Sequence, residues 1–401
     1  MLLSKDERQV LGNLPARYSP VMDSLIEDHY LVPVDSDEHH HVQNLRWILR
    51  RLDDAQKEKH ISHYTILPTT ACNARCYYCF EQGQRTVTMT AKTAVDVIGF
   101  IASNCGNDRR VRLSWFGGEP TVAAHRIDQI CDGLRNRGIA FQSDITSNGY
   151  LFDNTLIGRA VDLWNLTHCS ICVDGTRENY NKIKAYVGVA DNPYERVLNN
   201  IGLLLSRNVR VNLRMNFDYN NYQDFRGLID DITHRYSDKS YLQVHVHPII
   251  GEYLNPDGDI LHADDKWFAE KVVELNEMAR EAGVLNNDCL LPYLEYKGCQ
   301  AYSDNSVVIT PDGLLARCPE QFSDDQITGT IYEGEIHTDM VQSWKQFSDL
   351  EMCRQCLLFP ACQKMDKCAT RDICCYLPEH IQMFKSAMVK ALDNSEYNDS
   401  L

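Results

Sequence analysis

Strand-like segments with a two-residue alternation and helix-like segments with a longer apolar spacing follow one another six times between residues 61 and 283. The strand-like segments are residues 63–69, 111–116, 140–149, 168–175, 209–218 and 241–250, and each is followed by a helix-like segment, at 90–104, 125–138, 154–165, 194–208, 222–236 and 265–283. Serial β-then-α units fold into a parallel sheet with right-handed crossovers. Since eight units close a full barrel, this pattern predicts an α/β fold that is an open, partial (β/α)6 TIM-like barrel over residues 60–283.

The remaining residues predict three smaller parts. Residues 1–59 have apolar positions suited to a small helical or mixed cap, and the run His39–His41 reads as a solvated turn rather than a metal site. Residues 284–380 are rich in cysteine, and the stretch 306–318 predicts a β-hairpin with a Pro-Asp-Gly turn. Residues 381–401 predict a final helix and a polar tail.

The composition excludes several functional classes. The formal net charge is −16, which disfavours nucleic acid because binding its phosphates needs clustered Lys and Arg. No run of eighteen apolar residues predicts a membrane span, and the charged start lacks the apolar core of a signal peptide. We therefore expect a cytoplasmic protein with reduced thiols.

The chain nevertheless has 16 cysteines, and they are clustered. Three lie within residues 72–79, and eight more lie between residues 299 and 375. Disulfides are a poor explanation in a reducing compartment, so both groups favour metal or iron–sulfur binding. Four others fall in strand-like or helix-like segments and read as buried core residues, Cys105, Cys131, Cys169 and Cys172.

The first group, Cys72, Cys76 and Cys79, has the spacing C-x3-C-x2-C and directly follows the first predicted strand. A four-iron cubane usually takes four thiolates, so three protein ligands leave one iron open to a substrate or cofactor. The carboxyl ends of the strands form the working face of β/α barrels. The spacing therefore predicts a reactive cluster at that face, with a zinc site completed by a distant cysteine as the alternative.

This spacing, with the aromatic Tyr78 before the last cysteine, resembles the radical S-adenosylmethionine (SAM) superfamily. The resemblance implies that Cys72, Cys76 and Cys79 ligate a [4Fe-4S] cluster whose fourth iron binds SAM. Electron transfer from the cluster would then cleave SAM to a 5′-deoxyadenosyl radical, which abstracts a hydrogen from the substrate.

Further segments at predicted strand ends resemble SAM-contacting positions of the same family. Gly117, Gly118, Glu119 and Pro120 resemble its GGEP motif, Ser147 and Asn148 its TNG position, and Asp174 its DG position; Arg214 and Asn216 resemble polar SAM contacts. Each also has a plain structural interpretation, such as a Gly-containing turn. His245 and His247 alternate on the sixth strand, so both point to one face, where contact with substrate and simple packing are both open.

The C-terminal cysteines resemble the SPASM extension of radical SAM enzymes, which carries two auxiliary [4Fe-4S] clusters. The spacings Cys299-x13-Gly313-x4-Cys318 and Cys353-x2-Cys356-x5-Cys362 match it, whereas Cys362-x5-Cys368 is longer than the family's x3. The resemblance assigns Cys299, Cys318 and Cys368 to one cluster, with an open site or with Cys289 as fourth ligand. It assigns Cys353, Cys356, Cys362 and either Cys374 or Cys375 to the other. Zinc knuckles are the alternative, and Glu320 lies where related maturases have an acidic base.

Together these motifs resemble a SPASM-type peptide maturase that modifies a ribosomally made precursor. The resemblance implies a precursor peptide with a leader, and an electron donor such as flavodoxin or ferredoxin. We expect formation of a thioether between a cysteine sulfur and a carbon, as in sactipeptide- or ranthipeptide-type synthases. The alternatives are carbon–carbon linkage, epimerisation, an anaerobic sulfatase-maturing activity that makes formylglycine, and a non-catalytic metal protein.

Overall fold

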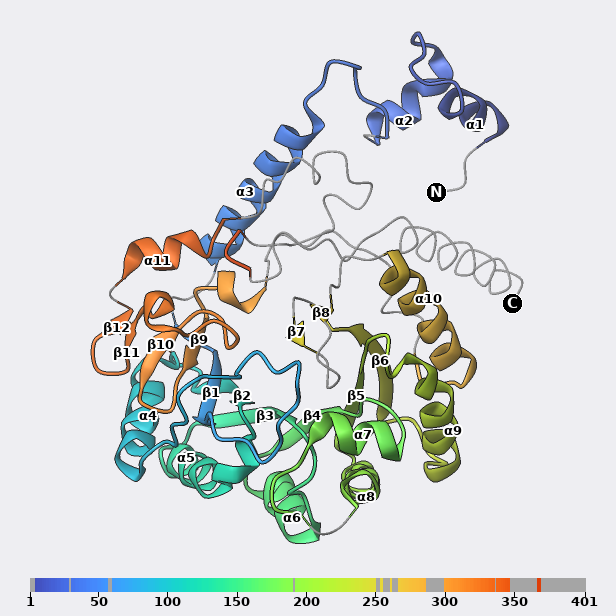
Figure 1. Ribbon diagram of the computed structural model, residues 1–401. Helices are drawn as coiled ribbons and strands as arrows, with labels where there is room; N and C mark the ends of the chain where they lie inside the picture. The colour runs from blue at the N-terminus through green and yellow to red at the C-terminus, as the bar shows by residue number, and fades with distance from the viewer. Residues whose placement is uncertain are drawn as a thin grey trace, which may run out of the picture. The chain divides into compact units, whose positions relative to one another are not determined.

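The computed structural model describes part of the chain (Figure 1). The described residues are 4–28, 30–56, 60–189, 192–249, 253–254, 260–261, 266–285, 299–335, 337–346 and 366–368. They fall into two compact units, residues 1–56 and 57–401. The predicted C-terminal helix lies outside the described residues. No helix among those described combines the length and the apolar character that a membrane crossing requires.

The first unit is helical. It contains the elements α1 (Lys5–Leu11), η1 (Pro20–Met22), α2 (Asp23–Glu27) and α3 (Glu38–Gln56). A capping box begins α1, because the Ser4 hydroxyl accepts from the Glu7 amide and the Glu7 carboxylate accepts from the Ser4 amide. His39–His41 lie in the first turns of α3. The predicted turn is therefore wrong. These histidines lie at the start of a helix, and the later residues of that helix have the apolar spacing typical of helices.

Six parallel strands form the centre of the second unit, and they pair in sequence order (Figure 1). They are β1 (His63–Thr69), β2 (Arg110–Gly117), β3 (Ala140–Ser147), β4 (Leu166–Cys172), β5 (Arg210–Phe217) and β6 (Leu242–Pro248). Among the described residues β6 is an edge strand and does not pair with β1. The predicted α/β class and open parallel arrangement are confirmed.

Helices connect these strands and lie along one side of the curved sheet (Figure 1). They are α4 (Ala91–Asn104), η2 (Pro120–Ala123), α5 (Ala124–Asn136), α6 (Asn154–Asp162), α7 (Arg177–Lys184), α8 (Pro193–Ser206), η3 (Tyr222–Asp224), α9 (Phe225–Arg235) and α10 (Lys266–Glu281). The sequence pattern missed α7, whose residues are mostly polar. A short antiparallel pair, β7 (Tyr253–Leu254) and β8 (Ile260–Leu261), follows β6.

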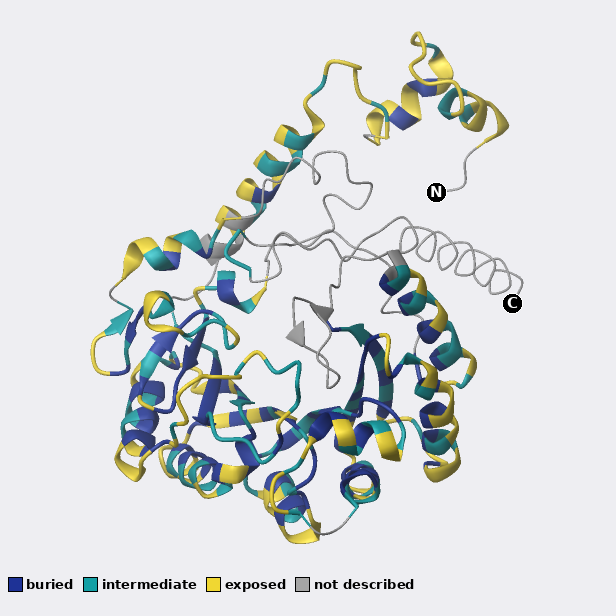
Figure 2. Ribbon diagram, in the orientation of Figure 1, coloured by how far each residue is buried: buried dark blue, intermediate teal, exposed yellow. Residues whose placement is uncertain are grey.

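The hydrophobic core fills the space between the sheet and these helices (Figure 2). Alternate residues of each strand enter it, so Val211, Leu213 and Met215 of β5 are fully buried there. The residues between them face the opposite side, which we call the inner face of the sheet. On β5 and β6 this face has a polar character, with Arg214 directly beside His245 and Asn216 beside His247.

The cysteine-rich region extends the same sheet beyond β1. Its described elements are η5 (Gln300–Tyr302), β9 (Ser306–Ile309), β10 (Leu314–Ala316), η6 (Asp324–Gln326), β11 (Gly329–Thr330), β12 (Gly334–Glu335) and α11 (Thr338–Ser343). β9 pairs in parallel with β1, and β10 returns antiparallel to β9. The predicted hairpin is confirmed, and its Gly313 has a φ of 85° that favours glycine. The pairing with β1 has no local signal in the sequence.

Candidate functional site

The loop with Cys72, Cys76 and Cys79 begins at the carboxyl end of β1. All three cysteines are partly buried. The Cys79 amide donates to the Cys76 carbonyl at 3.1 Å. The Gln82 side-chain amide donates to the carbonyls of Cys76 and Tyr77 at 2.8 and 2.9 Å. Backbone and side-chain hydrogen bonds thus shape this loop internally.

The three thiols influence one another electrostatically. The pKa of Cys72 is raised to about 11, mainly by burial, with smaller contributions from the charges of Glu119 and Cys79. Burial likewise raises the pKa of Cys76 to about 12, with contributions from Cys79 and Cys72, whereas the Lys184 ammonium lowers it. The pKa of Cys79 is also raised, mainly by burial. A bound cation would favour the thiolates that ligation requires.

The end of β2 lies directly against this loop because two glycines allow it. A Cβ on Gly117 would lie 2.3 Å from the Thr69 carbonyl oxygen, and one on Gly118 would lie 2.5 Å from that of Ala71. Gly117 also has a φ of 111°. The Gly118 and Glu119 amides donate to these same carbonyls, at 3.2 and 2.9 Å. Close backbone approach therefore explains both glycines.

Glu119 joins the ends of β2 and β3. Its buried carboxylate accepts from the Thr121 amide at 3.1 Å, the Ser147 hydroxyl at 2.8 Å and the Asn148 amide at 2.7 Å. Burial raises the pKa of Glu119, and the hydrogen bond from Thr121 is the largest opposing influence. Pro120 begins η2 directly after it. Both Glu119 oxygens are thus bonded within the chain.

Asn148 connects this junction to the cysteine loop. Its side-chain amide donates to Asn73 Oδ1 at 2.7 Å and lies 4.0 Å from the Cys72 sulfur. The Asn73 Nδ2 atom is buried and has no partner among the described residues. A donor that has no partner in the described part of the chain therefore lies next to the first cysteine.

A second network joins the loop to the ends of β4 and β5. Asp174 Oδ2 accepts from the Tyr78 hydroxyl at 2.5 Å and pairs with Lys184 Nζ at 2.7 Å. Asp174 Oδ1 accepts from both nitrogens of Asn216, at 3.2 and 3.0 Å. Lys184 Nζ also donates to the Tyr78 hydroxyl at 2.9 Å. Burial lowers the pKa of Lys184, but Asp174, Cys76, Tyr78 and Cys172 together outweigh it, so the net pKa lies well above the ordinary value.

The sequence analysis missed Lys184, which holds the loop in two ways. Besides its side-chain contacts, its carbonyl accepts from the Arg75 amide at 2.8 Å. Three residues later, the Val187 amide donates to the Asn73 carbonyl at 2.9 Å. A single lysine in a short polar helix gives no motif, so no local signal predicts this role.

Arg214, His245 and His247 lie together on the inner face of β5 and β6. Burial, followed by the Arg214 charge, lowers the pKa of both histidines to about 4. Their Nδ1 atoms bond to Asn212 Oδ1 and to the Pro248 carbonyl, each at 2.6 Å. Both partners are acceptors, so Nδ1 carries the hydrogen in the neutral ring. Arg214 Nε is buried and has no partner among the described residues.

The structure also brings three C-terminal cysteines near one another: Cys299, Cys318 and Cys368. Cys299 is exposed as a residue, but desolvation of its thiol by nearby protein atoms raises its pKa, with a contribution from Cys368. Burial raises the pKa of Cys318 to about 12, with a contribution from Cys299. The Gln321 side chain donates to the Lys367 carbonyl at 3.0 Å, which ties the turn after Cys318 to the segment with Cys368. The remaining predicted ligands lie outside the described residues: Cys289, Cys353, Cys356, Cys362, Cys374 and Cys375.

Two other predictions can be compared with the structure. Cys105, Cys131 and Cys169 are buried, as expected for core residues, but Cys172 is only partly buried. It lies beside Arg214 across β4 and β5, so its assignment to the core is wrong. Glu320 is exposed and lies two residues after the half-buried Cys318.

The thiols of the first loop are donors of the kind that an iron–sulfur cluster takes. No three His, Cys, Asp or Glu side chains in the described ranges are grouped so that they could hold one ion. A cubane distributes its thiolates over separate irons, so its ligands need not converge on one point. Within the described chain, Asn73 Nδ2 and the buried Glu81 Oε1 of the first loop have no partners, and neither does Arg214 Nε on β5. These two donors and one acceptor suit a zwitterionic ligand such as the methionine end of SAM.

Comparisons with known proteins agree with this geometry. Residues 66–232 match the Radical SAM superfamily model. Among solved structures, native anSMEcpe with bound AdoMet has a TM-score of 0.64 at 14% identity, covering 84% of this chain and 99% of that chain. SuiB from Streptococcus suis bound to S-adenosylmethionine has a TM-score of 0.57 at 16% identity, covering 85% and 81%. No curated protein matches the sequence.

The matched residues include the cysteine loop and the ends of β2, β3, β4 and β5, where the hydrogen-bonded networks described above meet. Residues 66–232 therefore form a domain of the radical SAM superfamily.

Proposed function

We propose that this chain is a peptide maturase that uses a [4Fe-4S] cluster held by Cys72, Cys76 and Cys79, together with SAM. The observation that carries the proposal is the attachment of this loop to four strand ends, through Gly118, Asn148 and Lys184 among others. Rigid support from several strands suits a site that must hold reacting atoms in fixed positions.

When bound, the cluster would supply the electron that cleaves SAM to methionine and a 5′-deoxyadenosyl radical. The chain's own contribution is positioning. Gly117 and Gly118 let the end of β2 lie directly against the loop. Asn73 and Arg214 offer unpaired donors among the described residues, and Asn216 and Asp174 hold Tyr78. Excluding water would protect the radical from side reactions.

We further propose a peptide substrate. Structures of similar fold include native anSMEcpe with bound AdoMet and Cp18Cys peptide, and Streptococcus suis SuiB bound to precursor peptide SuiA. For this chain the substrate would be a precursor peptide with a leader, and the helical residues 1–56 are the candidate leader-binding unit. Reduction would come from a donor such as flavodoxin or ferredoxin.

Thioether formation is the favoured modification. In the described part of residues 284–380, Cys368 raises the pKa of Cys299, and Cys299 raises the pKa of Cys318, so these three thiols lie near one another. A cluster with these ligands and one open position would accept a substrate cysteine sulfur. Cys353, Cys356, Cys362 and Cys374 or Cys375 are the proposed ligands of a second auxiliary cluster.

The second candidate is oxidation of a peptide cysteine or serine to formylglycine. This candidate is favoured because anSMEcpe, a protein of similar fold, is bound to a peptide named Cp18Cys. In that case a short target sequence would suffice, and no leader would be needed.

Mass spectrometry of the peptide products tests both candidates. The anaerobically reconstituted enzyme is incubated with SAM, reductant and either a cysteine-containing precursor or a short sulfatase-type peptide. Thioether formation removes two hydrogens and blocks one cysteine to alkylation, whereas formylglycine formation removes the sulfur. Unchanged peptides, with 5′-deoxyadenosine still formed, would contradict a peptide substrate of either kind.

A further inference from the structure

Arg317 is a buried cation located directly before Cys318. Its side chain is only 1% exposed. It forms an ion pair at 3.2 Å with Glu335, whose side chain is 25% exposed. Removing a guanidinium from water costs several kcal/mol unless hydrogen bonds replace its hydration. Such a residue therefore needs a specific set of acceptors.

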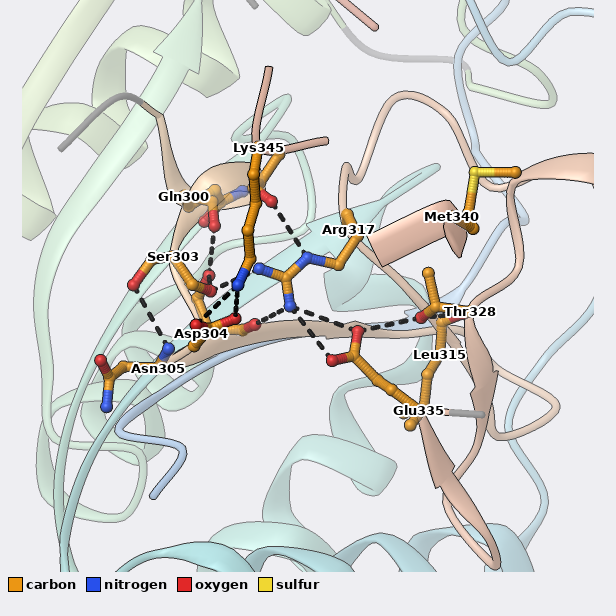
Figure 3. Close-up of polar contacts among 12 residues, drawn as sticks. Gln300, Ser303, Asp304, Asn305, Leu315, Arg317, Thr328, Glu335, Met340 and Lys345 are labelled. Atoms are coloured by element: carbon orange, nitrogen blue, oxygen red, sulfur yellow. Dashed lines mark hydrogen bonds and ion pairs between the residues drawn. The ribbon is translucent and has the colours of Figure 1, made fainter. Parts of the chain in front are cut away.

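Most of these acceptors belong to the segment that follows Cys299 (Figure 3). Arg317 Nε donates to the Ala301 carbonyl at 3.0 Å, and its two terminal nitrogens donate to the carbonyls of Ser306, at 3.1 Å, and Ser303. A planar group with donors in fixed directions can hold three carbonyls at once, which the single ammonium of lysine cannot do in the same way.

Glu335 completes the arrangement from the other side. Its carboxylate accepts from Arg317 and, at 3.0 Å, from the Thr328 hydroxyl (Figure 3). The Thr328 amide in turn donates to the Leu315 carbonyl at 2.8 Å. Arg317 therefore joins the segment after Cys299 to two strands. One is β10, which ends two residues before Cys318, and the other is β12, which follows Cys318 in the chain.

The Cys299 end of this segment has little apolar anchoring. Ala301 is the buried residue of η5, and Cys299 itself is exposed. The far end is fixed separately, because the Asn305 carbonyl accepts from the amides of Ser62 and His63. The Gln300 side chain accepts from the Thr65 hydroxyl at 3.3 Å, and the Gln300 carbonyl accepts from the Ser306 hydroxyl. The contacts made by Arg317 are the ones that tie this Cys299 end to the residue directly before Cys318.

We propose that Arg317 is the positioning residue of the auxiliary site: it places Cys299 and Cys318 together before a cluster binds. This inference rests on the proposed function, which assigns both cysteines to one auxiliary cluster. Groups that orient ligands without touching the metal typically change metal affinity by about 10–100-fold when replaced.

The test uses the full chain with Cys72, Cys76 and Cys79 replaced by alanine, so that bound iron reports the auxiliary sites alone. Arg317→Lys keeps the charge but loses the fork, and Cys299→Ala sets the size of a complete loss at this site. Arg112→Lys is the matched control, because Arg112 pairs with Asp144 on the same sheet while 62% exposed. Iron per chain and its rate of removal by a chelator are measured after anaerobic reconstitution.

We expect Arg317→Lys to lose iron to the extent of Cys299→Ala, or to release it at least about tenfold faster, while Arg112→Lys matches the parent. Hydrogen exchange of the metal-free proteins gives a readout that does not depend on iron. Residues 299–306 should lose protection in Arg317→Lys while the strands of the barrel keep theirs.

Unchanged iron retention and unchanged protection of residues 299–306 in Arg317→Lys would overturn the inference. Loss of protection throughout the barrel in Arg317→Lys would also overturn it, since Arg317 would then be a general stabilising residue. In that case Glu335→Gln, which keeps the three carbonyl contacts of Arg317, would show the same general loss. Absence of iron in the parent with Arg317 intact would instead contradict the auxiliary site of the proposed function, and the inference with it.

Discussion

Replacing Lys184 by methionine should destabilise the barrel strongly, because it leaves a buried carboxylate without its cation. Lys184 and Asp174 are 3% and 0% exposed, with 2.7 Å between Nζ and Oδ2. Breaking a buried ion pair by removing one partner costs about 3–5 kcal/mol. Asp174 keeps hydrogen bonds from Tyr78 and Asn216, so we expect a cost near the lower limit, about 3 kcal/mol.

Urea unfolding of the metal-free protein measures this cost. With a dependence of about 3 kcal/mol per molar urea, the midpoint should fall by about 1 M. The double variant Lys184→Met/Asp174→Asn should recover most of the loss, because it leaves no unpaired buried charge. Lys92→Met is the control: Lys92 is 77% exposed in its pair with Asp96, so its midpoint should stay unchanged.

An Lys184→Met midpoint equal to that of Lys92→Met would refute the reasoning. So would a double variant less stable than Lys184→Met, because the buried charge would then not be the source of the cost.

Further predictions concern pH, backbone space and the core cysteines. Because burial lowers the folded-state pKa of His245 and His247 from 6.5 to about 4, the unfolded chain binds more protons between these values. The free energy of unfolding should therefore fall on acidification from about pH 6.5 to pH 4. The upper limit is about 3 kcal/mol per ring, and the fall should be smaller because both rings keep some contact with solvent. The parent's free energy of unfolding should slope with pH over this range, whereas that of His245→Asn/His247→Gln should be flat. Gly118→Ala should lower iron binding and reduce the free energy of unfolding by about 1–3 kcal/mol, since its Cβ would clash with carbonyl oxygens of the cysteine loop. Gly99→Ala, with open space in a helix, should raise the free energy of unfolding by about 0.5–1 kcal/mol. Equal urea midpoints for the two variants would contradict the close approach of the backbones. Cys169→Ala should lower the thermal midpoint without changing iron content, because this cysteine is fully buried in the core; lost iron would make it a ligand.

The fold could be predicted from the sequence wherever local periodicity sets the structure. Each strand of the six-fold alternation sends every second residue into the core, as Leu213 and Met215 do, and this is visible in a single segment. The pairing of β9 with β1 was not predictable in this way, because residues 63–66 and 306–309 are far apart in sequence and their contact depends on the whole sheet.

The candidate site was predictable where a motif carries it and not where single residues do. The spacing of the cysteines and the paired glycines identified the loop and the end of β2. Lys184, Asn73 and Arg317 act through contacts with distant segments, and neither their identity nor their neighbours mark them. The bond from the Ser147 hydroxyl to Glu119 is likewise a contact between strand ends that the motif does not predict.

The central claim is that Cys72, Cys76 and Cys79 hold a cluster with one iron open to SAM. The most direct measurement is the electron paramagnetic resonance spectrum of the reduced, anaerobically reconstituted protein, recorded with and without SAM. We predict a [4Fe-4S] signal that changes when SAM is added and that disappears in Cys76→Ala. A protein that binds zinc instead of iron at this loop, or a signal that SAM leaves unchanged, would contradict the account.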